Sequence, residues 1–74
     1  MNLMWLPHPD NQQHWEICYA GPTPIIAGWY KYNGTEKVIA FLATPTPTII
    51  ELPKADLALA KKLIETFAEY MLNS

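Results

Sequence analysis

Apolar residues gather in stretches of strand length that are separated by proline-rich connections. The stretch from Trp15 to Ala20 alternates, and the next ones are rich in β-branched and aromatic side chains. The four stretches are residues 15–20, 25–32, 35–43 and 48–52. Pro-x-Pro segments stand at 7–9, 22–24 and 45–47. Because proline cannot donate to a sheet ladder, these segments are connections, and the pattern predicts an antiparallel β-meander of three to four strands.

The dipeptide Asn33-Gly34 predicts a tight turn between the second and third of these stretches. Both residues tolerate the positive φ that a type I′ hairpin turn requires. A two-residue turn fixes the register and places Lys31 opposite Glu36, which is a favourable cross-strand pair. We therefore expect these two strands to form the centre of the sheet.

A C-terminal helix is predicted over residues 54–72. Pro53 suits the first turn of a helix, and residues 55–72 are good helix formers without Gly or Pro. Helical spacing places one apolar stripe on a single side: Leu57, Ala60, Ile64, Phe67, Ala68 and Met71. Three further apolar residues widen that arc beyond what a surface helix needs: Leu59, Leu63 and Tyr70. The predicted fold class is therefore α+β, with the helix packed on one sheet face.

A single helix leaves the other sheet face without a cover. We expect the helix on the face where Ala27 and Ala40 lie opposite each other, because small residues allow close approach. The second face then exposes Ile26, Tyr30, Tyr32, Ile39 and Phe41. If the faces are exchanged, Trp29, Val38 and Leu42 form the exposed patch instead. The leading segment, residues 1–6, is also apolar, so it is a candidate cover for the second face and the patch is then simple core.

Length and composition limit the range of functions. The chain has 74 residues, which indicates one small domain with an N-terminal segment and loop (1–14), a sheet (15–52) and a helix (54–72). Half of the residues are hydrophobic, which excludes a disordered chain. No apolar run reaches the length of a membrane span, and the start does not resemble a secretory signal. With Cys18 as the single cysteine, we expect a cytoplasmic protein.

Charge argues against a nucleic-acid partner. The formal net charge is −2, and all five basic residues are lysines. Proteins that bind nucleic acids neutralise phosphates and favour arginine for base contacts. The alternative of a single-strand binder that stacks bases on Tyr30 and Tyr32 beside Lys37 is therefore the weaker one.

No constellation of residues predicts catalysis, a metal site, a cofactor or a small-molecule substrate. The one cluster of possible ligands is His8, Asp10, His14 and Cys18, and its spacing matches no standard zinc signature. On a strand that begins near His14, Cys18 lies about 13 Å away at about 3.3 Å per residue, which is too far to share an ion. We expect loop histidines and a packed thiol.

These observations favour a small non-catalytic module that binds a larger protein or a second copy of itself. The expected binding residues are Tyr30, Tyr32, Phe41, Ile39, Ile26, Leu59, Leu63 and Tyr70. An open edge strand is a second candidate surface, although the flanking prolines shorten it. A compact acidic chain of this kind is similar in general character to small inhibitors encoded by phages and mobile elements, including anti-CRISPR-like proteins. That likeness is one of general type only, and no sequence motif supports it.

Overall fold

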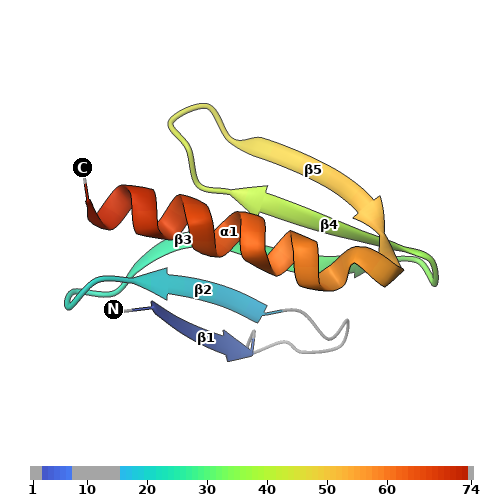
Figure 1. Cartoon of the computed structure of the whole chain (residues 1–74), viewed down its shortest axis with the longest axis horizontal. Coiled ribbons are helices and arrows are strands. Elements are labelled where there is room, and N and C mark those ends of the chain that lie inside the picture. Colours follow the sequence, from blue (N-terminus) through green and yellow to red (C-terminus); the bar gives the residue numbers. More distant parts are fainter. Residues whose placement is uncertain (1–2, 8–15, 74) are drawn as a thin grey trace.

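The computed structural model describes residues 3–7 and 16–73, and within them the chain forms a five-stranded antiparallel sheet and one long helix (Figure 1). Neighbours in the sheet follow chain order, β1-β2-β3-β4-β5. The strands are β1 (Leu3–Pro7), β2 (Glu16–Ala20), β3 (Ile25–Asn33), β4 (Lys37–Leu42) and β5 (Thr48–Pro53), and they are followed by a 3₁₀ turn (Lys54–Asp56) and α1 (Leu57–Leu72). The predicted α+β meander with a C-terminal helix on one face is confirmed, with five strands instead of three to four.

The additional strand is β1, which comes from the leading apolar segment. It pairs along its whole length with β2, from Leu3 opposite Ala20 to Pro7 opposite Glu16. Four consecutive apolar residues, 3–6, show no alternation, so the pattern alone did not indicate a strand. The described part of this segment therefore widens the sheet and does not fold across its second face.

The turn between β3 and β4 differs from the predicted one, and the difference changes the register. Asn33 pairs with Lys37, so the loop is three residues long and Gly34 has a φ of 74°. Lys31 consequently lies opposite Ile39, and the predicted pair with Glu36 does not form. The register of β3 against β4 is therefore shifted by three residues. Because side chains alternate between faces, an odd shift places each β3 side chain on the face opposite to the one predicted from its β4 partner.

An irregularity between β2 and β3 adds a second change. Cys18 pairs with Gly28 and Tyr19 pairs with Ile26, which leaves Ala27 as an extra residue in β3. Ala27 is fully buried in the core. Such a bulge shifts the alternation along the strand by one position. Ile26 therefore stays on the face opposite α1, as predicted, while the residues after the bulge change sides.

The helix packs on a sheet face that is lined centrally by small residues. Ala60, Ile64 and Ala68 of α1 are completely buried, and so are the core residues Cys18, Ala20, Ala27, Val38 and Ala40 of the sheet. A Cβ atom at Gly28 would lie 3.0 Å from Cγ2 of Ile64 and 2.3 Å from the carbonyl oxygen of Phe41. The helix can approach this closely because small residues, Cys18, Ala27, Gly28 and Ala40, occupy the part of the sheet beneath Ile64.

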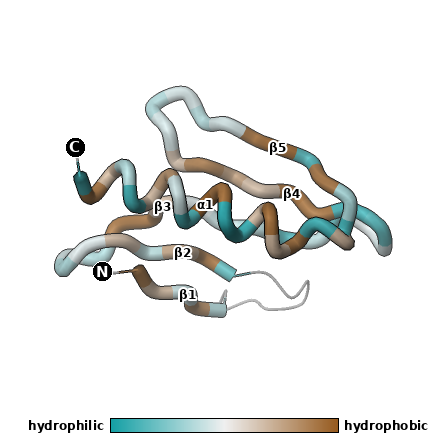
Figure 2. The backbone as a smooth tube through the Cα atoms, viewed as in Figure 1, coloured by the Kyte–Doolittle hydropathy of each residue, from teal (hydrophilic) through white to brown (hydrophobic). Residues whose placement is uncertain are grey.

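Figure 2 shows the consequence for hydropathy along the chain. The α1 trace alternates between brown and teal, as expected for a helix with one buried stripe, and β4 is brown to tan along most of its length. A strand that is apolar at consecutive positions presents apolar side chains to both faces of the sheet. The helix accounts for one of these faces.

Candidate protein-interaction surface

We call the side of the sheet opposite α1 the open face. Its members follow from the strand register, since cross-strand partners share a face and neighbours along a strand alternate. They are Met4, Leu6, Ile17, Tyr19, Ile26, Trp29, Lys31, Asn33, Lys37, Ile39, Phe41, Ile49, Glu51 and Pro53. Among the described residues, the elements outside the sheet pack on its other side, where α1 contacts β2, β3, β4 and β5.

One line of apolar side chains crosses all five strands of the open face. We call it the central row; it consists of Leu6, Ile17, Trp29, Phe41 and Ile49. The rings of Trp29 and Phe41 stack with their centroids 4.9 Å apart and an interplanar angle of 6°. At the two ends of the row, Leu6 is 43% exposed and Ile49 is 66% exposed, whereas Trp29 and Phe41 are half-buried and Ile17 is buried, with 8% of its surface exposed. The row is therefore continuous from one sheet edge to the other and contains no polar side chain.

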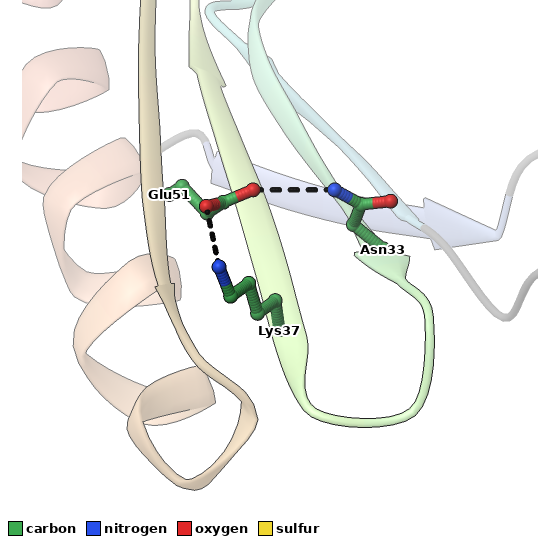
Figure 3. A network of polar contacts seen from close by, with 3 residues as sticks. All are labelled: Asn33, Lys37 and Glu51. Atoms are coloured by element: carbon green, nitrogen blue, oxygen red, sulfur yellow. Dashed lines mark hydrogen bonds and ion pairs between the residues drawn. The ribbon is translucent and has the colours of Figure 1, made fainter.

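Three polar side chains of the open face, Asn33, Lys37 and Glu51, lie together in one corner (Figure 3). Glu51 reaches across β4, where it accepts hydrogen bonds from Nδ2 of Asn33 and Nζ of Lys37, both at 3.2 Å. The hydrogen bonds and the positive charge of Lys37 lower the pKa of the Glu51 carboxyl. Lys31 stands next to the central row, with Nζ 5.9 Å from the ring centroid of Trp29. We call Asn33, Lys37 and Glu51 the polar corner.

A shallow depression adjoins the polar corner. It has a volume of about 360 Å³ and is lined by Glu36, Lys37, Glu51, Leu52 and Pro53. Its two carboxylates and one lysine include the Lys37–Glu51 ion pair. Among the ion pairs described, none joins Glu36 to another residue that lines the depression.

On the opposite side, polar side chains join the helix to the sheet and β3 to β2. The hydroxyl of Tyr30 donates to Glu16 at 2.5 Å, and Nε1 of Trp5 donates to Glu65 of α1 at 2.9 Å. Nζ of Lys61 lies 3.9 Å from the Glu16 carboxylate and 5.0 Å from the Trp5 ring centroid. Burial, and then the bond to Glu16, raise the pKa of Tyr30 far above its usual value. These groups satisfy one another, so their role here is structural.

The thiol of Cys18 lies in the core beneath the helix. The residue is completely buried, and burial, with a smaller contribution from Glu65, raises the pKa of the thiol to about 11. A thiol with this pKa is protonated at neutral pH and is a poor nucleophile. His8, Asp10 and His14 lie outside the described residues; within residues 3–7 and 16–73, no group of three or more His, Cys, Asp or Glu residues is close enough to hold a metal ion.

The structure divides the predicted binding residues among three places. Ile26, Ile39 and Phe41 lie on the open face, as expected. Tyr30 and Tyr32 do not, because the three-residue turn and the bulge direct them towards the helix. Tyr30 is only 5% exposed, and Tyr32 is half-buried, with Nζ of Lys54 5.1 Å from its ring centroid. The expectation that both tyrosines are exposed on the second face was wrong.

The remaining predicted residues lie on α1, on the opposite side of the molecule from the open face. Leu59 and Tyr70 are exposed, and Leu63 is half-buried. They therefore do not extend the open face into one larger surface.

Several open-face residues were missed from the sequence. These are Met4, Leu6, Ile17, Tyr19, Trp29 and Ile49. The alternation of residues 15–20 had already placed Ile17 and Tyr19 on one side of their strand. What was lacking was the register that aligns this side with Trp29 and Phe41.

Comparisons with protein-family models, with curated proteins and with solved structures found no match to this chain. In the part of the chain that the structure describes, no helix has both the length and the apolar character needed to cross a membrane. The physical character of the surface is therefore the basis for the functional proposal.

Proposed function

We propose that this protein is a small non-catalytic interaction module that binds a protein partner through its open face. The observation that supports this function is the central row, five apolar side chains that cross the whole sheet on the face opposite α1. Contiguous apolar surface on a folded domain marks an interaction site, because burying it gains about 25 cal/mol for each Å² removed from water.

The composition of β4 supports the same proposal. Val38 and Ala40 point towards α1 and are completely buried, whereas Ile39 and Phe41 alternate with them and point to the open face. Strands with apolar residues at successive positions are typical of sheets that are covered on both sides. A protein partner on the open face supplies the second cover.

Nucleic acid is the weaker alternative. The proposed stacking platform of Tyr30 and Tyr32 beside Lys37 is not on one face, since both tyrosines turn towards the helix. Of the two lysines on the open face, Lys37 is paired with Glu51 at 3.2 Å. A face with so little free positive charge suits an apolar protein surface better than a phosphate backbone. Inhibition of a larger protein, in the manner of small phage proteins, is one activity that such a module performs by occupying a partner's surface.

Photo-crosslinking from the two sides of the molecule tests this function. Ile49 and Tyr70 are 66% and 72% exposed and lie on the open face and on the outer surface of α1, respectively. Each is replaced in turn by a photoreactive benzoylphenylalanine in the cells that produce the protein. We expect protein adducts from position 49 and none from position 70. Adducts from position 70 alone, or adducts to nucleic acid, contradict the proposal.

A further inference from the structure

We propose that the occupant of the open face is a second copy of this chain, so that two sheets stack face to face with the helices outside. This inference rests on the proposed function and specifies its partner. The resulting assembly has four layers, helix, sheet, sheet and helix. The two central rows form its middle.

The area of the open face is adequate for such a dimer. Five strands about 4.8 Å apart, with four successive rows about 6.6 Å apart, span roughly 19 by 20 Å between the outermost strands and rows. Two faces of that size bury about 800 Å² in total, which is in the range of weak, transient protein interfaces. This estimate predicts a weak dimer that dissociates on dilution.

The shape and pattern of the face also fit a copy of itself. A second sheet of the same width covers all five strands, and stacked sheets place their side chains in one layer about 10 Å thick. A twofold axis that lies between the two sheets and runs parallel to the central row places one central row on the other. It also moves the two polar corners to opposite ends of the strands. Asn33, Lys37 and Glu51 then stay at the rim, where their hydrogen bonds remain in water. The contact is isologous and therefore closes at two copies.

Charge favours an apolar partner of this kind over a strongly charged one. The open face carries Lys31, Lys37 and Glu51, so its formal charge is +1. The chain as a whole carries −2. Such a small charge on the face gives little repulsion between two copies, and it offers little attraction to an acidic or basic protein.

Light scattering with a matched pair of variants tests the dimer. Ile49→Lys places a charge at the exposed end of the central row, and Leu59→Lys makes the same change on α1, where the side chain is 47% exposed. We expect the wild type to have twice the mass of one chain at about 100 μM, and Ile49→Lys to raise the dissociation constant about tenfold or more. Leu59→Lys is expected to leave the mass unchanged. Circular dichroism confirms that both variants are folded.

Three results overturn the inference. The first is a monomeric wild type at that concentration; the second is a dimer that Ile49→Lys does not weaken; the third is an equal loss in both variants. Isotope-filtered NMR on a mixture of labelled and unlabelled chains gives independent evidence, with intermolecular contacts expected from the methyl groups of Ile39 and Ile49 and not from those of Leu59.

The same experiments separate this inference from the proposed function. A monomer whose position 49 crosslinks to a different protein overturns the dimer and retains the interaction module. A monomer that forms no adduct from position 49 removes both.

Discussion

The two faces of the sheet use opposite residue sizes at their centres. Under α1, Cys18, Gly28 and Leu42 form one row, and two of these three residues are small. On the open face, the corresponding central row carries Ile17, Trp29 and Phe41. A helix approaches a sheet closely only where the side chains of the sheet are small. Two stacked sheets, in contrast, need large side chains to fill the layer between them. The difference explains why α1 packs closely on one side, and it supports the proposal that a flat partner surface covers the other.

Polar groups follow the same division. On the helix side, the Trp5–Glu65 hydrogen bond and the Lys61–Glu16 ion pair join α1 to the sheet, and the Tyr30–Glu16 hydrogen bond joins β3 to β2. On the open face, the polar corner is limited to the ends of three strands. The helix side therefore uses polar contacts for cohesion, whereas on the open face the hydrogen-bonded polar groups lie in the polar corner and Lys31 contacts the central row, over the Trp29 ring.

The largest expected effect tests the close approach of the helix. In Gly28→Ala the new Cβ lies 2.3 Å from a backbone oxygen of β4, so strand or helix must shift, and we expect a loss of about 3 kcal/mol in the free energy of unfolding. Gly34→Ala is the matched control: it has open space around the Cβ and a φ of 74°, so its cost is backbone strain of about 1 kcal/mol. Urea unfolding measures both. Equal losses contradict the close packing of β4 and α1 around Gly28.

Two neighbouring residues of β4 compare the faces directly. Val38 is completely buried under the helix, and Val38→Ala is expected to destabilise the fold by about 2.5 kcal/mol. Ile39 is half-buried on the open face, and Ile39→Ala is expected to cost about 1 kcal/mol although it removes more atoms. Urea unfolding is measured at protein concentrations at which the chain is monomeric. A larger loss for Ile39 would show that something in the monomer covers the open face.

The bond between Tyr30 and Glu16 tests cohesion on the helix side. Tyr30→Phe keeps the ring in the core and removes the hydroxyl donor, and we expect a loss of about 1.5 kcal/mol because the acceptor is a charged carboxylate. Tyr70→Phe is the control, since Tyr70 is 72% exposed, and it should change the free energy of unfolding by less than about 0.5 kcal/mol. Thermal or urea unfolding distinguishes the two. An equal effect in both variants contradicts a stabilising role for the bond.

The smallest effect comes from the polar corner. The folded-state pKa of Glu51 is lowered, so its contribution to stability is present above the unfolded-state pKa and is lost as the pH falls through the lowered value. The carboxyl resonance of Glu51 should therefore titrate at a lower pH than that of a free glutamate, and Lys37→Ala should move it back. An unshifted resonance in the wild type argues against the hydrogen bonds from Asn33 and Lys37.

Part of this structure was predictable because it depends on short-range patterns. The run of helix formers after Pro53 and the stripe that contains Ala60, Ile64 and Ala68 identified α1 and its buried side. Four of the five strands followed from apolar runs between Pro-x-Pro segments. On β4, the division of Val38 and Ala40 from Ile39 and Phe41 followed from simple alternation, and it holds in the fold.

The candidate surface was less predictable, since it depends on which strand positions share a face. The three-residue loop after Asn33 shifts the register of β3 against β4 by an odd number of residues. The extra residue at Ala27 shifts the inward–outward alternation along β3 by one position. Together they bury Tyr30 and bring Trp29 to the open face next to Phe41. Neither event has a clear local signal, because Asn-Gly is compatible with turns of more than one length and a bulge is stabilised by the packing around it.

By itself the sequence determined the order of four strands and the helix, the buried stripe of that helix and the excess of apolar residues over what one helix can cover. These features depend on propensity and on periodicity within one element, both of which are local. The tertiary structure decided the register of β3, the use of residues 3–7 as a fifth strand and hence the membership of the central row. The register between strands depends on contacts between residues that are far apart in the sequence, including the packing of α1 against the small residues of the sheet. These contacts exist only once the sheet has formed.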